Sequence, residues 1–314
     1  MLALTAGFAT IGQGAGPMVL TQRAGLFAKH GLDVEIRLMG GAVGVVRGLM
    51  SGEIQFGNLA APALLRSVLR DNTDLAFLTG GINQQFLMVR PEITQRSQLQ
   101  GAKLGFAGDG GINDILVYFL IERLAREDIG GLQLVQVTTS GKDRCERLLS
   151  KETDAEVITP PESVEGLRRG CRILIDFADY GLNFALGGVA ARRSYVAAHE
   201  EIAKAFVRAY VEGMHRYRTD RVLTVQVQAE YSGLKDISIA EETYDTTCPG
   251  MPKAPYPVVK ALSVALQIMS RELPQASKTD ARIFVDDRFV RELDESGFIG
   301  ALYANRTEEI KNDG

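Results

Sequence analysis

The sequence predicts an α/β protein of two lobes followed by a helical segment. The chain has 314 residues, which is too long for one small domain and suits two units of about 100–200 residues each. Short apolar strands alternate with amphipathic helices over the first part of the chain, a pattern typical of parallel βαβ units. Clusters among the 33 Gly residues fall where a strand gives way to a helix. Together these observations favour open α/β sheets, which bind ligands at the ends of their strands.

The composition is that of a folded protein without a nucleic-acid partner. Hydrophobic residues make up 46% and charged residues 24%, which excludes general disorder. The net charge is -4 and no basic block occurs, so we expect no nucleic-acid binding. No apolar run approaches the roughly 20 residues that span a membrane. The first residues, Met1–Thr5, already fit a strand, so we expect that a secretory signal peptide is absent or has been removed.

The cysteines and histidines form no metal-binding pattern. Neither the three Cys nor the three His residues have the spacing of metal ligands, so we expect no metal site. An odd number of cysteines excludes complete internal pairing, and buried free thiols are favoured over a single disulfide. These residues are Cys145, Cys171, Cys248, His30, His199 and His215.

The chain up to Thr79 alternates strands and helices. An apolar strand, Leu2–Gly7, is followed by a glycine-rich loop that places Pro17 in the first turn of a helix. That helix ends at Gly31, which can adopt the left-handed cap conformation. In the next strand apolar side chains alternate with charged ones, as expected for a half-buried strand. The expected elements are the helices Met18–Lys29, Val43–Ser51 and Pro62–Arg70 and the strands Asp33–Met39, Ile54–Leu59 and Leu75–Thr79.

A second α/β series begins near Pro91, and a helical segment begins at Ser194. The second series is expected to hold the strands Lys103–Ala107, Leu132–Val137, Ala155–Thr159 and Arg172–Asp176 and the helices Ile112–Arg126, Asp143–Ser150 and Glu162–Arg168. The final segment is expected to hold the helices Glu200–Arg218, Arg221–Glu230, Pro257–Ser270 and Asp287–Ser296. A segment without strands of its own must pack on the existing sheets.

Two glycine loops are the most informative for function. Gly40–Ala42 and Gly108–Gly111 each join a strand end to a helix start, where free amide groups and the helix dipole favour an anion or a polar oxygen. The alternative is that these glycines only make tight turns, but two such loops in separate α/β units favour one ligand shared by both lobes. No G-x-G-x-x-G, G-x-x-x-x-G-K-[ST] or G-x-S-x-G motif occurs. We therefore expect no nucleotide cofactor and no hydrolase nucleophile.

Four segments carry a resemblance to a known family. They are QRAGLFAKHGLDVEIRLMGG (Gln22–Gly41), LMSGEIQFGNLAAPALL (Leu49–Leu65), SQLQGAKLGF (Ser97–Phe106) and VDDRFVRELDESGFI (Val285–Ile299). They resemble the periplasmic substrate-binding proteins of nitrate, sulfonate and taurine ABC importers, whose superfamily also holds thiamine-pyrimidine-synthase-like proteins. The resemblance covers most of the chain in the same order.

The resemblance implies a type II periplasmic-binding-protein fold, in which two α/β lobes joined by two crossovers enclose a ligand in a cleft. We place the crossovers at Gln85–Arg90 and Phe184–Val189. Lobe one then comprises residues 1–88 and 190–314, with the helical tail, and lobe two comprises residues 89–189. Closure about these extended segments would surround the ligand and exclude water, which strengthens its polar contacts.

The ligand positions implied by the family fall at strand ends in both lobes. Amide side chains among them both donate and accept hydrogen bonds, which suits a polar organic ligand, whereas the alternative role of each residue is a turn or a cap. Lobe one offers Phe8, Thr10, Gln13, Gly41, Ala42, Asn58, Ala60, Gly80 and Asn83. Lobe two offers Gly108, Asp109, Gly110, Gly111, Asn113, Thr159, Glu162 and Asn183.

Asp109 departs from the family pattern. Sulfonate binders carry small hydroxyl residues in this loop, as the resemblance implies, and a carboxylate there would repel a sulfonate or a nitrate. Asp109, together with Glu162, would instead pair with a cationic or N–H group of the ligand. The alternative is that Asp109 faces solvent or interacts with the dipole of the following helix. We therefore expect a small polar ligand with a nitrogen or cationic feature.

The function implied by the resemblance is solute binding without catalysis. The protein would capture a small polar organic molecule, sulfonate-like, taurine-like or pyrimidine-like, and deliver it to the membrane permease of an ABC importer. We expect a monomer in the periplasm. One alternative is an enzyme on the same fold, pyrimidine-synthase-like or aromatic-decarboxylase-like, although the Cys-rich metal motif of pyrimidine synthases is missing. A second alternative is a cytoplasmic ligand sensor, because the chain begins directly with a strand.

Overall fold

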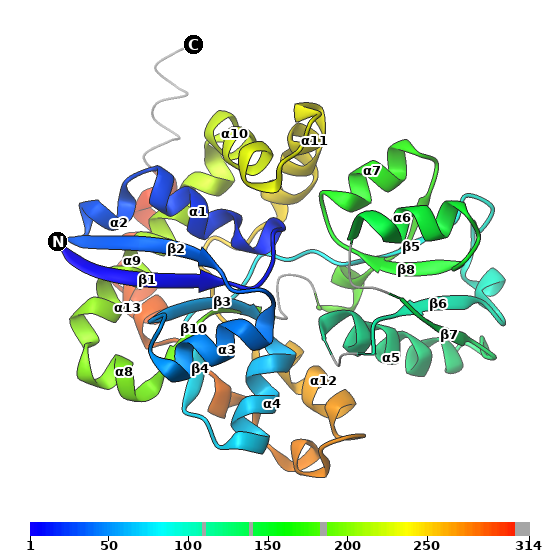
Figure 1. The fold of residues 1–314 in the computed structure, drawn as a ribbon, viewed down its shortest axis with the longest axis horizontal. Coiled ribbons are helices and arrows are strands. Elements are labelled where there is room, and N and C mark those ends of the chain that lie inside the picture. The colour runs from blue at the N-terminus through cyan, green and yellow to red at the C-terminus, as the bar shows by residue number, and fades with distance from the viewer. Residues whose placement is uncertain (109–110, 138–140, 183–186, 305–314) are drawn as a thin grey trace.

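The chain folds into two α/β lobes, each built on a five-stranded sheet (Figure 1). The structure is a computed structural model that describes residues 1–108, 111–137, 141–182 and 187–304. The first sheet has the order β2-β1-β3-β10-β4. Its strands are β1 (Leu2–Phe8), β2 (Leu32–Leu38), β3 (Phe56–Ala60), β4 (Leu75–Phe77) and β10 (Gly187–Arg192).

Lobe one carries four helices between its first strands. They are α1 (Gly16–Arg23), α2 (Leu26–Lys29), α3 (Ala42–Ser51) and α4 (Ala61–Asp71). The single helix predicted over Met18–Lys29 is divided, because Gly25 adopts a left-handed conformation with φ 68°. The four expected strands and the other two expected helices of this region lie within a few residues of their predicted bounds.

The second sheet has the order β7-β6-β8-β5-β9. Its strands are β5 (Phe86–Val89), β6 (Lys103–Phe106), β7 (Gln133–Gln136), β8 (Ala155–Ile158) and β9 (Arg172–Asp176). The helices of this lobe are α5 (Ile112–Ala125), α6 (Gly141–Leu149) and α7 (Glu162–Arg168). The extended run predicted as a crossover at Gln85–Arg90 is therefore mostly strand β5, which pairs with both β8 and β9.

Both sheets are mixed, whereas the alternation of strands and helices predicts parallel pairing. In the first sheet β10 runs antiparallel to β3 and β4, and in the second sheet β5 runs antiparallel to β8 and β9. Each reversed strand is the first strand after the chain passes from one lobe to the other. It therefore starts at the edge of its sheet that faces the other lobe, where the neighbouring strands end.

The helical segment packs on lobe one and covers its sheet. Its helices are α8 (Arg193–Ala198), α9 (Glu200–Thr219), α10 (Arg221–Ser232), α11 (Ile237–Thr247), α12 (Val259–Met269) and α13 (Arg288–Glu295). The Phe206 ring of α9 stacks on Phe56 of β3, with ring centroids 3.8 Å apart, and also on Phe27. The sequence analysis missed α8 and α11. Among the described residues, no helix has both the length and the apolar character needed to cross a bilayer.

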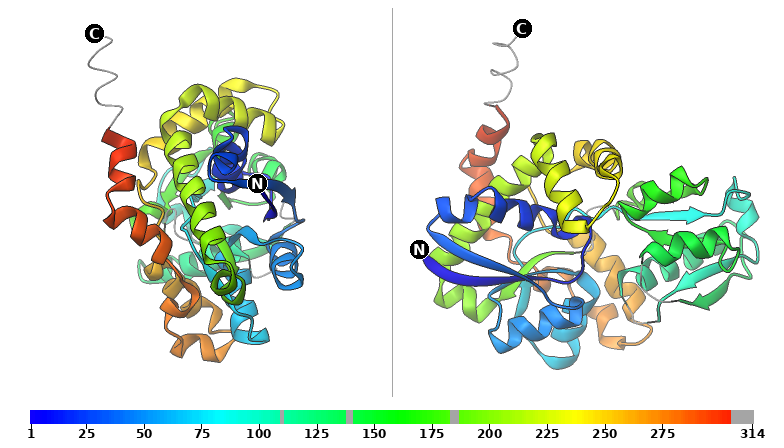
Figure 2. Two further views of the ribbon diagram at one scale, coloured as in Figure 1. Left: turned by 90° about the vertical axis from the view of Figure 1, so that its left-hand side faces the viewer. Right: turned by 45° about the horizontal axis from the view of Figure 1, so that its top comes forward.

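The lobes also touch away from the crossovers. Helix α12 of lobe one packs against α4 and against α5 of lobe two, and buried residues of all three helices belong to one apolar cluster. Helix α11 of lobe one meets α7 of lobe two, and the right-hand view of Figure 2 shows the yellow and orange parts of the helical segment beside the second lobe.

Candidate ligand-binding site

The strand directions place the carboxyl ends of both sheets at the boundary between the lobes. Phe86, the first residue of β5, pairs with Ile158 at the end of β8. Gly187, the first residue of β10, pairs with Ala60 at the end of β3. Because β5 and β10 enter their sheets from the other lobe, the ends of β3 and β8 face that lobe as well. The loops after these strands are where ligands of open α/β sheets bind.

Gln13 is the most informative residue of lobe one. Its side chain is only 3% exposed, and its Oε1 accepts a long hydrogen bond of 3.4 Å from the backbone N–H of Gln84. Within the described part of the chain, the Nε2 group of Gln13 has no hydrogen-bond partner. A buried amide donor without a partner costs about 1–3 kcal/mol, so a polar atom that reached it would recover this free energy.

Two glutamines that lead into β5 show the same feature. Gln84 is 8% exposed and Gln85 is fully buried, and the described residues offer no partner to the Oε1 atom of either side chain. Next to them, the side chain of Asn83 packs so closely on Gly14 that a Cβ atom at Gly14 would overlap it. The loop after β1 and the chain leaving lobe one thus bring unpartnered buried amides to one place.

Other predicted residues of lobe one are occupied by contacts inside the lobe. The side chain of Asn58 lies against the buried hydroxyl of Tyr210. The N–H of Gly41 donates to the carbonyl of Ala9 at 2.7 Å, so this amide is not free for an anion. Gly41 has φ 108° and precedes Ala42, the first residue of α3, while Ala60 precedes α4.

Gly80 has a packing role. Its N–H donates to the carbonyl of Pro255 at 2.6 Å, and an added Cβ would overlap the carbonyl oxygen of Tyr256. A glycine is therefore required here for close approach of two backbones. This packing requirement accounts for a glycine at position 80 without any contact to a ligand.

Phe8 and Thr10 lie beside helix α10. The Phe8 ring meets Tyr231 edge-on at 5.6 Å and lines a cavity of about 450 Å³ on lobe one together with Val19, Ile36 and Val227. The Tyr231 hydroxyl accepts from the N–H of Gly12 at 3.0 Å and donates to the carbonyl of Thr10 at 3.2 Å. Helix α10 therefore holds the loop that carries Gln13.

Two of the predicted lobe-two residues, Asn113 and Glu162, lie near an arginine that was not predicted, Arg144. Arg144 of α6 is 8% exposed, and its guanidinium donates to the carbonyl of Val157 near the end of β8. With the Asn113 amide oriented to satisfy the hydrogen bonds, its oxygen accepts from Arg144 as well. The only sequence signal for a buried position is that Arg144 precedes the fully buried Leu148 by four residues and so shares its helix face.

Glu162 lies close enough to Arg144 to be influenced by its charge. Burial raises the pKa of the Glu162 carboxyl, and the backbone amide of Glu162 and the charge of Arg144 oppose this rise only in part. Thr159, half-buried before the Pro160–Pro161 pair, accepts from the N–H of Ser163 at 3.1 Å through its carbonyl. Gly111 precedes α5, and Gly108 is exposed with φ 78°. Asp109, Gly110 and Asn183 lie outside the described residues.

The described residues of the site provide polar groups that suit the binding of a ligand. The residues that the structure describes contain no group of three or more His, Cys, Asp or Glu side chains that could hold a metal ion. The thiols of Cys145, Cys171 and Cys248 are free and buried. Burial raises the pKa of Cys145 and of Cys248 to about 12, so these thiols stay protonated at neutral pH.

A family model described as "NMT1/THI5 like" matches residues 14–220, which is more than half of the chain. The chain belongs to the NMT1/THI5-like family. No curated protein matches this NMT1/THI5-like chain.

Solved structures similar to the NMT1/THI5-like chain share its fold at low sequence identity. The periplasmic aliphatic sulphonate binding protein SsuA from Escherichia coli has a TM-score of 0.73 and 18% identity, over 91% of this chain and 92% of that one. A putative sulfonate ABC transporter periplasmic sulfonate-binding protein SsuA from Methylobacillus flagellatus KT has a TM-score of 0.70 and 20% identity, over 94% of both chains. The periplasmic nitrate-binding protein NrtA from Synechocystis PCC 6803 has a TM-score of 0.73 and 15% identity, over 94% and 89%. These likenesses confirm the predicted periplasmic-binding-protein fold.

Proposed function

We propose that this NMT1/THI5-like protein is a solute-binding protein that captures a small organic acid between its lobes for an ABC importer. The observation that carries the proposal is the Nε2 group of Gln13, which has no partner among the described residues and is buried where the loop after β1 meets the chain that leaves lobe one. Buried polar groups are normally paired, so a donor without a partner at this position points to a ligand.

The charge of lobe two favours an acidic group on the ligand. The buried guanidinium of Arg144 lies with Asn113 at the carboxyl edge of the second sheet, and Arg is well suited to bind carboxylates and sulfonates. The amides of Gln13 and Gln84 offer a donor and an acceptor to the other end of the ligand, which suits a hydroxyl, amide or amino group. We therefore favour an anionic ligand over the ligand with a nitrogen or cationic feature that was expected from Asp109.

The names of the structural relatives agree with an acidic ligand. Two of them are named as sulfonate-binding and one as nitrate-binding proteins, and all three are named as periplasmic. A membrane permease as partner and the periplasm as location are part of the proposal for the same reason. A catalytic step is not part of it, because the buried thiols are protonated at neutral pH and a buried carboxyl such as Glu162 does not by itself indicate acid–base catalysis.

The test is a calorimetric titration with ethanesulfonate, taurine, nitrate and 4-aminopyrimidine. We expect an acidic compound to bind the wild-type chain and to bind Arg144→Gln at least tenfold more weakly. Arg123→Gln, which alters an exposed arginine of α5 in the same lobe, should bind like the wild type. Binding of 4-aminopyrimidine alone, or an unchanged affinity of Arg144→Gln for the acidic compound, would contradict the proposal.

A further inference from the structure

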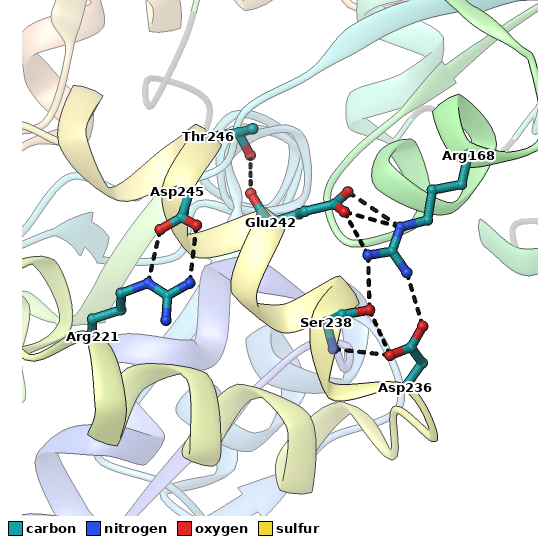
Figure 3. Close-up of polar contacts among 7 residues, drawn as sticks. All are labelled: Arg168, Arg221, Asp236, Ser238, Glu242, Asp245 and Thr246. Atoms are coloured by element: carbon teal, nitrogen blue, oxygen red, sulfur yellow. Dashed lines mark hydrogen bonds and ion pairs between the residues drawn. The ribbon is translucent and has the colours of Figure 1, made fainter.

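The lobes meet on two sides of the crossovers through contacts of different chemical kind. Where α12 packs against α4 and α5, the contact is largely apolar. The exposed ion pair between Arg271 and Glu122 accompanies it, with the Arg271 guanidinium 5.0 Å from the centre of the Tyr118 ring. Where α7 meets α11, the side-chain contacts are polar and are made by one arginine of α7, Arg168 (Figure 3).

Arg168, the last residue of α7, reaches across the lobe boundary with its whole guanidinium. Its Nη1 donates to Asp236 at 2.8 Å, its Nη2 donates to Ser238 at 2.8 Å and to Glu242 at 2.6 Å, and its Nε donates to Glu242 at 3.2 Å. Each contact joins lobe two to α11 or to Asp236, the residue directly before it. A planar guanidinium whose three nitrogen atoms all donate fixes a specific geometry rather than a general attraction.

Two acceptors of Arg168, Asp236 and Ser238, also form hydrogen bonds with each other. The Oδ1 atom of Asp236 accepts from the N–H and the hydroxyl of Ser238 and so caps α11, which leaves Oδ2 for Arg168. Arg221 of α10 donates to both carboxylate oxygens of another α11 residue, Asp245, at 2.9 and 3.0 Å, and this contact lies apart from Arg168 (Figure 3). The acceptors of Arg168 therefore all belong to lobe one and do not include the Arg221 contact.

Helix α7 connects this contact to the candidate ligand site. Glu162 is its first residue and Arg168 its last, so the two are separated by about 9 Å of helix at 1.5 Å per residue. A rigid helix of this length transmits a displacement at one end to the other.

We propose that Arg168 with Asp236, Ser238 and Glu242 forms a reversible clasp that holds the two lobes together without ligand, while the α4–α12–α5 contact acts as the pivot. The physical reason is the unequal cost of separation. Exposed ion pairs exchange their partners for water at little cost in free energy, and the Arg168 side chain is 32% exposed. Apolar contacts lose free energy in proportion to the area exposed, so they open last.

The test measures the distance between the lobes in the full chain with sodium chloride as the only variable. Spin labels at Arg47→Cys on α3 and Glu152→Cys in lobe two suit this purpose, because both positions are exposed and the three natural cysteines are buried. At about 0.01 M salt we expect one narrow distance distribution, and at 1 M, where the Debye length falls to about 3 Å, a shift to longer distances. Arg168→Gln should give the longer distances at both salt concentrations.

Arg221→Gln is the matched control. It removes an arginine that also bridges two carboxylates of α11, but within lobe one, so the distance between the lobes should stay as in the wild type. Glu242→Gln, which removes the other side of the clasp, should shift the distances in the same direction as Arg168→Gln. The proposal is overturned if Arg168→Gln keeps the wild-type distances at low salt, or if Arg221→Gln lengthens them equally. Because no ligand is present, this result does not depend on the proposed function.

Discussion

Replacing Gln13 by methionine should separate ligand binding from folding. The two side chains are unbranched and similar in volume, so the substitution removes polar atoms from a site that is 3% exposed without opening a large cavity. Two opposing effects on the free energy of unfolding follow. Loss of the unpartnered Nε2 group relieves about 1–3 kcal/mol, and loss of Oε1 leaves the N–H of Gln84 without its 3.4 Å bond at a similar cost. We expect a net change within about 1 kcal/mol.

The effect on ligand affinity is not balanced in this way. A neutral ligand atom that accepts from Nε2 loses a hydrogen bond worth about 0.5–1.5 kcal/mol, which corresponds to about 2- to 10-fold weaker binding. Urea unfolding gives the change in stability, and calorimetric titration with the acidic compound that binds the wild type gives the change in affinity.

Gln228→Met is the matched control for this prediction. Gln228 is also buried, its Oε1 accepts a 3.4 Å bond from the Tyr217 hydroxyl, and its Nε2 has no partner among the described residues, but it lies within α10. The same balance of effects on stability applies, and ligand binding should be unchanged. The reasoning is refuted if Gln13→Met binds like the wild type, or if Gln228→Met loses affinity to the same degree.

Three further predictions follow from burial. Burial raises the pKa of the Glu162 carboxyl above 4.5, so its contribution to stability is present below about pH 4.5 and is lost as the pH rises through the folded-state pKa. In urea unfolding, Glu162→Gln should therefore stabilise the fold at pH 7 but not at pH 4. Equal effects at both pH values would argue against a buried carboxyl. Gly80→Ala should lower the free energy of unfolding by about 1–3 kcal/mol, because the added Cβ overlaps the Tyr256 carbonyl. The folded variant should keep the ligand affinity of the wild type. A stable variant that no longer binds would instead indicate that Gly80 contacts the ligand. The three buried thiols should react with a thiol reagent at pH 8 only after denaturation, and rapid labelling of the native chain would show that one of them is accessible.

Local pattern was sufficient to predict most elements of both lobes. The strand β2 is visible because charged Glu35 and Arg37 alternate with apolar residues, and the α7 bounds Glu162–Arg168 match the prediction residue for residue. The resemblance of four segments added the two-lobed fold, which the family match and the solved structures confirm. These features depend on residues close together in the sequence.

Features that depend on distant residues could not be predicted in this way. The reversed directions of β5 and β10 follow from where the chain enters each sheet, and short extended runs carry no sign of direction. Arg144 looks like an ordinary helix arginine until α6 places it beside Asn113 and the end of β8. The unpartnered amide of Gln13 becomes visible only when Gln84, far along the chain, is packed against it.

A crystal structure of the chain with the acidic compound that binds it would show whether the ligand lies between the lobes. We expect one molecule there, with a polar atom within hydrogen-bond distance of Gln13 Nε2 and an acidic group facing Arg144. A compound bound outside this boundary, for example in the cavity lined by Phe8 and Tyr231, or one that touches a single lobe only, would contradict it.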